Sequence, residues 1–319
     1  MVHKKYICTY FDYSFLPRGL ALFFSLKQFY DEFDFYILTF DEQTFNHIEG
    51  LNEDKIKLIS FKEYNDYFQT SIDRFEDKKQ YYFSATPNIC IYLLEQNPEI
   101  DLLLYLDADV YIFNSLENLF AEVESASIAF CAHRFTTLYK YLSKNHGKYN
   151  VGVNFFRNDE ISKSCLKDWQ NDCTNWYKGM PGYDLVYFSD QIFLDEWERK
   201  YPNVKIIQNI GVNVAPWNIA RYHFSEKNRE YYVNESPLII FHFSALKQID
   251  EKRWNGNTIY YFGSIKDVLR DIYISYIKEV ESYSCGSTKV AAINLKFNWF
   301  KKMFYRVMGL FLNEIVILK

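Results

Sequence analysis

The fold is decided by one stretch of the sequence, Asp101-Leu-Leu-Leu-Tyr-Leu-Asp-Ala-Asp109. Its first part, residues 101–106, contains a continuous apolar run. Such a run is typical of a buried central strand of a parallel sheet, because helices cover both faces of that sheet. A second apolar run, Val110-Tyr-Ile-Phe113, follows directly. The stretch therefore predicts an α/β fold in which Asp107 and Asp109 stand at the carboxyl end of a central strand, where ligands of open α/β sheets bind.

The rest of the chain reads as strands alternating with helices, which favours a single mixed α/β domain over residues 1–282. Strands are predicted over residues 6–10, 36–40, 55–61, 127–132, 151–156, 204–208 and 238–243, and helices over residues 19–33, 86–96, 161–176, 189–199 and 258–281. Thr86 is the expected cap of the second helix, with Pro87 at its first position. Asn158 and Asp159 are expected to cap the third.

Composition excludes several function classes. The net charge of −5 in 319 residues argues against nonspecific binding of nucleic acid, which needs basic surface. Six cysteines without a Cys-x-x-Cys pair indicate neither a zinc knuckle nor a redox dithiol, and they fit a reduced, cytoplasmic setting. We expect no export signal and no membrane span. The aromatic content of 20% is mostly interpreted as core filling, with a smaller part placed at sites such as Tyr10 and Trp217.

Asp107 and Asp109 concentrate negative charge at the rim of a buried element, which is costly without a cation. A divalent metal that prefers oxygen ligands, Mn²⁺ or Mg²⁺, would remove this cost and would also neutralise a diphosphate. The alternative is a loop with two solvated acids. A phosphatase of the haloacid-dehalogenase type also places Asp-x-Asp after an apolar strand, but Tyr111 stands where that family has Thr or Val.

Five motifs follow one another in the order found in a known family. They are Ile7-Cys-Thr-Tyr-Phe-Asp12 with Ser25-Leu26 in the following helix, Leu104-Tyr-Leu-Asp-Ala-Asp-Val-Tyr-Ile112, Asn150-Val-Gly-Val153, Asp190-Gln191, and Ile239-Ile-Phe-His-Phe243. Together they resemble the motifs of family-8-like retaining glycosyltransferases of the GT-A fold, as found in bacterial polysaccharide and lipopolysaccharide synthesis. The resemblance spans about residues 6–250. It implies a mixed sheet flanked by helices and a hexosyltransferase that uses a nucleotide sugar, with UDP favoured.

The resemblance also implies roles for individual residues. Asp107, Asp109 and His242 would hold the metal. Thr9 and Asp12 would hold the base and ribose of the nucleotide, and Ala108 and Lys247 would also contact it. Tyr10 is placed to stack on the base, and Arg18, just past the same loop, to reach either a phosphate or a nearby acid. Gln191 would lie near the donor sugar, and Asp190 would bind its hydroxyls or, in an inverting enzyme, act as the base.

Some positions depart from the family. After the late histidine the family has Gly three places and Lys six places further on, whereas here Ala245 and Lys247 lie three and five places after His242. Val151 replaces a usual Ser, and Ile192 a frequent polar residue. His242 can also be read as a core histidine, Lys247 as a solvated lysine, and the Asp190-Gln191 pair as charge compensation at a helix N-terminus behind Ser189.

The last part of the chain, residues 283–319, is predicted to be a basic amphipathic helical tail. From Cys285 onward it has six cations and one anion, interleaved with Trp299, Phe300 and Phe304. This pattern fits peripheral contact with an anionic membrane, as on the inner face of the cytoplasmic membrane beside a lipid-linked acceptor, but equally a helix that docks on the domain.

Two further classes remain open. One is a non-catalytic module that binds a nucleotide sugar. The other is a nucleotidyltransferase, against which the glycine-free loop Thr9–Arg18 counts.

Overall fold

The computed structural model of the protein describes residues 4–71, 75, 78–137, 143–176, 190–258, 261, 263–284 and 315–318. A seven-stranded sheet forms its centre, in the order β3-β2-β1-β4-β7-β6-β8. Its strands are β1 (Lys5–Phe11), β2 (Phe33–Thr39), β3 (Ile56–Ile59), β4 (Leu102–Leu106), β6 (Ile128–Ala132), β7 (Tyr149–Arg157) and β8 (Val204–Ile207). All pairs are parallel except those of β7, which runs antiparallel to both β4 and β6. The sheet is therefore mixed, and β4 lies at its centre.

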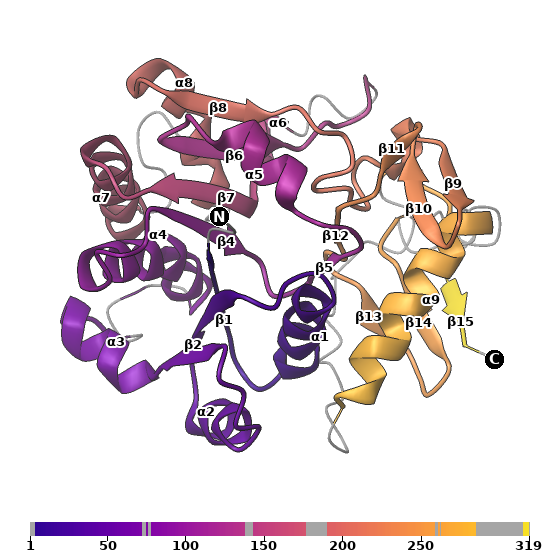
Figure 1. Cartoon of the computed structure of the whole chain (residues 1–319), viewed down its shortest axis with the longest axis horizontal. Helices are drawn as coiled ribbons and strands as arrows, with labels where there is room; N and C mark the ends of the chain where they lie inside the picture. Colours follow the sequence, from indigo (N-terminus) through magenta and orange to yellow (C-terminus); the bar gives the residue numbers. More distant parts are fainter. Residues whose placement is uncertain are drawn as a thin grey trace, which may run out of the picture.

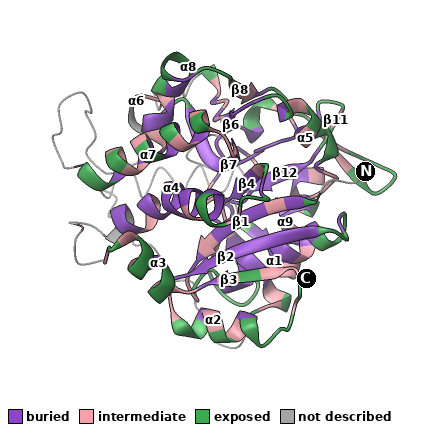
Figure 2. Cartoon of the chain, turned by 60° about the vertical axis from the view of Figure 1, so that its left-hand side comes forward, coloured by how far each residue is buried: buried purple, intermediate pink, exposed green. Residues whose placement is uncertain are grey.

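Helices cover both faces of this sheet (Figure 1). The α-helices are α1 (Leu16–Lys27), α2 (Glu42–Glu49), α3 (Phe61–Phe68), α4 (Lys78–Gln96), α5 (Glu117–Val123), α6 (Ser143–His146), α7 (Glu160–Asn175), α8 (Trp197–Lys200) and α9 (Asp267–Ser282), and the 3₁₀ helices are η3 (Asp190–Glu196) and η4 (Ile219–Arg221). Alternate residues of β4 enter different cores: Leu103 and Tyr105 pack with α4 and α7, while Leu104 and Leu106 pack with α1 and α5. Figure 2 shows the resulting buried strands between helices with exposed outer faces.

A smaller part of the molecule lies beside the carboxyl ends of the central strands. Here β5 (Val110–Ile112) pairs antiparallel with β12 (Ile240–His242). Two three-stranded sheets flank this pair: β9 (Phe224–Lys227), β10 (Glu230–Val233) and β11 (Ser236–Pro237) form one, and β13 (Lys247–Gln248), β14 (Arg253–Asn255) and β15 (Ile315–Ile317) form the other. Helix α9 packs against them, and the rings of Phe243 and Tyr276 stack with centroids 3.8 Å apart.

The structure confirms the predicted α/β class and most elements. The cap of α7 is as expected, because the Asp159 carboxylate accepts a hydrogen bond from the backbone N–H of Ser162 at 2.8 Å. Three helix starts were wrong. Helix α4 begins at Lys78, so Thr86 and Pro87 lie inside it; the turn before the proline is held by Tyr81, which is fully buried against Phe40.

Helix α9 begins at Asp267 rather than at residue 258. Helix α1 is also displaced: it spans Leu16–Lys27 instead of residues 19–33. The chain has already become strand β2 at Phe33, where Phe33, Phe35 and Ile37 are all buried.

Most of the predicted tail lies outside the described residues. Its last described segment is strand β15, which pairs with β14. Val316 is buried beneath this sheet, while Ile315 and Ile317 face outward. The expected helix therefore does not extend to the end of the tail, because the β-branched run Ile315-Val-Ile317 favours a strand.

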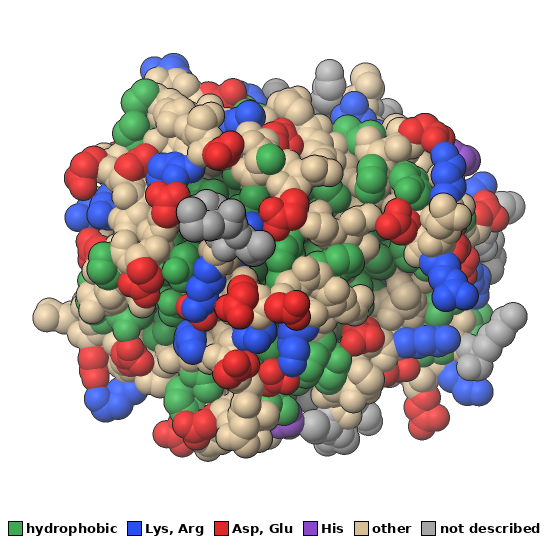
Figure 3. All heavy atoms as spheres, viewed as in Figure 1, with side chains coloured by type: hydrophobic (Ala, Val, Ile, Leu, Met, Phe, Trp, Pro, Cys, Tyr) green, Lys and Arg blue, Asp and Glu red, His purple; other side chains and the backbone are tan. Residues whose placement is uncertain are grey.

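Two further expectations concern the charge of the surface and the presence of membrane-spanning helices. Acidic and basic side chains are interspersed on the face seen in Figure 3. In the part of the chain that the structure describes, no helix has the length and apolar character needed to cross a membrane.

Candidate active site

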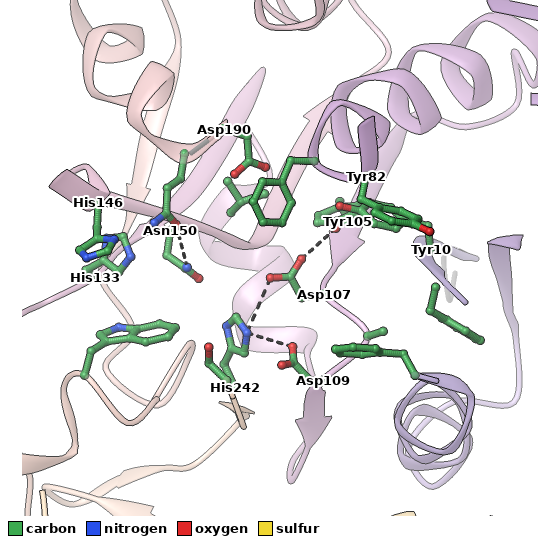
Figure 4. A pocket seen from close by; sticks show the side chains of 18 of the residues that line it. Tyr10, Tyr82, Tyr105, Asp107, Asp109, His133, His146, Asn150, Asp190 and His242 are labelled. Carbon is green, nitrogen blue, oxygen red and sulfur yellow. Dashed lines mark hydrogen bonds and ion pairs between the residues drawn. The ribbon is translucent and has the colours of Figure 1, made fainter. Parts of the chain in front are cut away.

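Asp107, Asp109 and His242 come together at the carboxyl end of β4 (Figure 4). After β4 the chain makes a tight turn, in which the N–H of Val110 donates to the carbonyl of Asp107 at 3.2 Å. Strand β5 then pairs with β12, which places His242 opposite Val110. As a result, the His242 Nε2 lies 3.0 Å from Asp109 Oδ1 and 3.6 Å from Asp107 Oδ2.

The geometry of these three residues suits a divalent cation. One ligand atom from each lies within 4.8 Å of the other two. Burial raises the pKa of Asp107, and the charge of Asp109 adds to this. Burial would also raise the pKa of Asp109, but His242 and, more weakly, Arg18 outweigh it and lower that pKa. Carboxylate oxygens suit Mg²⁺ and Mn²⁺, and an imidazole nitrogen can coordinate first-row divalent metals beside them. The residues present therefore fit the expected metal.

Two residues that sequence reasoning missed hold this cluster in place. The Tyr105 hydroxyl donates to Asp107 Oδ1 at 2.8 Å. Residues two apart on a strand point to the same face, so the spacing of Tyr105 and Asp107 in the sequence already indicated that their side chains lie side by side. Gly152 packs against the ring of His242: a Cβ there would lie 2.6 Å from Nδ1 and 2.7 Å from Cε1. The glycine of the Asn150-Val-Gly-Val153 motif thus leaves room for His242.

Gln191 is oriented by a chain of amide hydrogen bonds. Asn150 Oδ1 accepts from the backbone N–H of Gly152 and from Asn213 Nδ2, both at 3.0 Å. A backbone N–H can only donate, so the oxygen of Asn150 must face it. The Asn150 Nδ2 is then left to donate to Gln191 Oε1 at 3.2 Å. This network fixes which atom of the Gln191 amide is the oxygen.

Asp190 lies at the start of η3, and its side chain lines the same cavity. Its backbone carbonyl accepts a hydrogen bond from the Trp169 indole at 3.1 Å, which ties it to α7. Burial and the neighbouring Asp107 carboxylate raise the pKa of Asp190 to about 8. The segment is a 3₁₀ helix rather than the α-helix expected from residue 189, and Ser189 itself lies outside the described residues.

The cluster opens into a cavity of about 490 Å³. It is lined by Tyr10, Phe11, Asp12, Phe15, Phe40, Tyr82, Phe83, Tyr105, Asp107, Ala108, Asp109, His133, Phe135, His146, Asn150, Val151, Asp190, Gln191, Trp217, His242, Ser244 and Tyr261. Of the residues expected to contact the nucleotide, Tyr10, Asp12 and Ala108 thus face this cavity. The Tyr10 ring packs edge-on against Phe40, and its hydroxyl lies 3.0 Å from the Thr86 hydroxyl.

Three of the predicted nucleotide-binding residues lie outside the cavity lining. Thr9 is fully buried in β1. The buried Arg18 guanidinium donates a hydrogen bond at 2.9 Å to the carbonyl of Leu246, in the loop after His242. Its positive charge also helps to lower the pKa of Asp109. Lys247 lies in β13, opposite Asn255, and its pKa is lowered by burial.

Sequence comparison finds relatives whose function is not described. No protein-family model matches the chain. The uncharacterized protein YfnD of Bacillus subtilis (strain 168) is 22% identical over 266 residues, which cover 83% of this chain and 85% of YfnD. The uncharacterized protein YfnF of the same strain is 27% identical over 251 residues, which cover 75% of this chain and 81% of YfnF.

Structural comparison is more informative. The galactosyltransferase LgtC, solved with donor and acceptor sugar analogues, aligns with a TM-score of 0.50 and 16% identity over 75% of this chain and 87% of LgtC. The chain has the GT-A fold. Mouse xyloside xylosyltransferase 1 aligns equally well, with a TM-score of 0.50 and 13% identity over 76% of this chain and 98% of that enzyme. At these identities the likeness concerns the fold, and it confirms the resemblance drawn from the motifs at that level.

In the GT-A fold of this chain, the cavity lies at the carboxyl ends of β1 and β4. Asp12 follows β1 directly, and Asp107 follows β4. Ligands of open α/β sheets bind at such strand ends, because loops there present side chains above a rigid base. The cluster of Asp107, Asp109 and His242 therefore lies at the position in the fold where a ligand is expected to bind.

Proposed function

We propose that this protein is a metal-dependent glycosyltransferase that moves a hexose from a nucleotide diphosphate donor to a saccharide or lipid-linked saccharide. The observation that carries this proposal is the Asp107-Asp109-His242 cluster, which lies inside an aromatic-lined cavity at the strand ends of a GT-A sheet. The relatives solved with this fold include a galactosyltransferase and a xylosyltransferase, which supports the reaction class.

In the proposed reaction, the acceptor hydroxyl oxygen forms a bond to the anomeric carbon. The bond from that carbon to the diphosphate oxygen breaks, its electron pair stays on the diphosphate, and the hydroxyl proton passes to the departing diphosphate. The main barrier is the negative charge that develops on the leaving group. Mn²⁺ or Mg²⁺ held by the cluster would supply Lewis-acid stabilisation of that charge.

The chain's own residues hold the donor in place. We assign Gln191 to the donor sugar, and the support is its fixed amide, whose oxygen is anchored by Asn150. Asp190 would bind sugar hydroxyls, and its raised pKa lets it donate as well as accept hydrogen bonds near neutral pH. No strong general base is needed if the reaction retains the anomeric configuration, and we favour retention from the family resemblance.

We assign the nucleotide to the part of the cavity beside β1. Tyr10 would contact the base, Asp12 the ribose, and Ala108 the nucleotide between the two metal ligands. Arg18 would stabilise the charge of Asp109 rather than contact a phosphate, because its guanidinium donates a hydrogen bond to the Leu246 carbonyl. Thr9 and Lys247 would need a rearrangement to touch the nucleotide. UDP is favoured by the resemblance alone.

A role in polysaccharide or lipopolysaccharide synthesis, with peripheral contact to the membrane through the basic tail, is part of the same proposal. Its support is the sequence pattern of residues 283–319. Liposome binding by the full chain, compared with a chain ending at Tyr283, tests it. Equal binding by both chains would exclude the tail as the contact.

A nucleotide-release assay across a panel of nucleotide sugars with Mn²⁺ tests the proposed activity. We expect slow hydrolysis of one donor, which would identify that donor without knowledge of the acceptor. Donor binding without any release would instead support a non-catalytic sugar-nucleotide module. Full activity in excess chelator would exclude the metal-dependent mechanism.

A further inference from the structure

Strand β15 forms one edge of the small sheet β13-β14-β15, beside helix α9 (Figure 1). It pairs with β14 on one side, and no strand pairs with its other side in the part of the chain that the structure describes. Edge strands offer unpaired N–H and C=O groups to other strands, and proteins commonly protect them with charged residues or proline. The run Ile315-Val-Ile317 has neither, so this edge is open to pairing.

The backbone of β15 alternates between its partner strand and the open edge. The N–H of Leu318 donates to the carbonyl of Lys252 at 2.9 Å, and the register of β14 and β15 continues through this pair. Hydrogen-bonded and non-hydrogen-bonded pairs alternate along an antiparallel ladder. Val316 is therefore bonded to β14, whereas the N–H and C=O groups of Ile315 and Ile317 point toward the open edge.

The other side of β14 leads to the same alternation. The N–H of Ile249 donates to the carbonyl of Arg253 at 2.7 Å, so the backbone of Arg253 faces β13. The backbone groups of the next residue, Trp254, must then face β15, where Trp254 stands opposite Val316. Both neighbours of β14 thus agree on which groups of β15 are left unpaired by it.

The side chains of β15 add apolar surface to this edge. Val316 is fully buried and packs with Trp254 and α9 in one core cluster. Successive side chains of a strand point to opposite faces, so Ile315 and Ile317 lie on the outer face of the sheet. Their exposed fractions are 39% and 47%, which leaves much of both side chains available for burial by a partner.

The edge is complementary to itself. The run Ile315-Val-Ile317 reads the same in both directions, so antiparallel pairing centred on Val316 places each isoleucine opposite an isoleucine of a second copy. Ile315 then faces the partner's Ile317, and both residues have their backbone groups free for the exchange. A shift by one residue would instead place an isoleucine opposite Val316, whose groups are already bonded to β14. The centred register is therefore specified.

From this geometry we propose that β15 is an interaction surface for a second copy of the chain, which pairs antiparallel with it about a twofold axis at Val316. The small sheets of the two copies become one continuous sheet, and the exposed isoleucines cover one another across the axis. An edge of three residues covers less than the roughly 800 Å² per partner of a stable interface, so the dimer is weak and depends on concentration. None of these residues lines the cavity, so the proposal is independent of the proposed function.

Sedimentation velocity of the full chain, from low to high micromolar concentration, measures the association. We expect monomers at the low end and dimers at the high end. Ile317→Lys places a charge against the partner's Ile315, and the symmetry of the interface repeats this change on both sides of the axis. It should therefore weaken the dimer about tenfold or more.

Ile317→Pro is a second variant that acts on the backbone. Proline removes only an N–H that points toward the open edge, a position where sheets tolerate it, so the monomer should fold while the dimer is lost. The matched control is Leu51→Lys, which changes an apolar residue of similar exposure, 37%, outside this sheet. It should dimerise as the wild type does, and thermal unfolding checks that all variants are folded.

Amide exchange followed by NMR at both ends of the concentration range tests the register. The amides of Ile315 and Ile317 should become protected as the concentration rises, whereas the amide of Val316 should be protected throughout. A dimer that leaves the amides of Ile315 and Ile317 unprotected would overturn the proposal.

Three results of the sedimentation experiment would also overturn it. The first is a wild type that stays monomeric at every concentration; if it floats with phosphatidylglycerol vesicles and Ile317→Pro does not, the edge contacts a membrane instead. The second is a dimer that both folded Ile317 variants still form, which would place the interface elsewhere. The third is an equal loss of the dimer in Leu51→Lys, which would show that β15 has no special part in association.

Discussion

Replacing Gly152 by alanine should weaken metal binding while the sheet stays intact. The added Cβ would lie 2.6 Å from Nδ1 and 2.7 Å from Cε1 of His242, whereas ordinary contacts begin at 3.4 Å. The imidazole must therefore withdraw by about 0.8 Å, because the Cβ is fixed to strand β7. Metal–ligand distances tolerate only about 0.2 Å, so His242 would be displaced from its place beside Asp109.

The expected loss is about 10- to 100-fold in Mn²⁺ affinity, the size found when residues that orient a ligand are changed. Overpacking should also cost about 1–3 kcal/mol of unfolding free energy. Titration calorimetry with Mn²⁺ measures the first effect, and thermal unfolding the second. Gly50→Ala is the matched control, because its Cβ would lie on the surface, 3.3 Å from the Asn46 carbonyl oxygen and 3.5 Å from that of His47. A folded Gly152→Ala variant that binds Mn²⁺ as tightly as the wild type would show that Gly152 does not position His242.

Three further changes test the rest of the site. Tyr105→Phe removes the hydrogen bond to Asp107 and should reduce Mn²⁺ affinity about tenfold by calorimetry, and unchanged affinity would exclude the role given to this hydroxyl. Asn150→Asp keeps the acceptor oxygen but removes the donor to Gln191, so kcat for donor hydrolysis should fall by up to about 100-fold with little change in KM; a change in KM alone would contradict this. Asp190 has a native pKa raised to about 8, so its contribution to the free energy of unfolding is complete below about pH 4 and is lost as the pH rises toward 8. The melting temperature of the metal-free wild type should therefore drop more between pH 5 and 8.5 than that of Asp190→Asn, and parallel curves would show that Asp190 is not protonated.

The apolar run before Asp107 was sufficient to predict a buried central strand, because five consecutive apolar residues are typical of a strand that helices cover on both faces. The position of Asp107 and Asp109 at its end followed from the same run. The placement of His242 beside them could not be derived from spacing, since it depends on the pairing of β12 with β5, more than a hundred residues apart. Only the resemblance to the family suggested it.

Errors in helix starts have a common physical origin. A helix cap at Thr86 is consistent with the neighbouring residues, but the burial of Tyr81 extends α4 by more than two turns before Pro87. Tertiary packing overrode a local stop signal. Of the aromatic residues that line the cavity, Trp217 was singled out in the sequence, whereas Phe135 was not, because aromatic residues are so common in this chain that Phe135 could not be distinguished from core residues.

We propose that Asp107, Asp109 and His242 hold the metal that activates a nucleotide sugar. The most direct test is donor release with Mn²⁺ by the wild type and by Asp109→Asn, with folding checked by circular dichroism. We expect release of one nucleotide by the wild type and no detectable release by the variant. Normal turnover by a folded Asp109→Asn variant would contradict it.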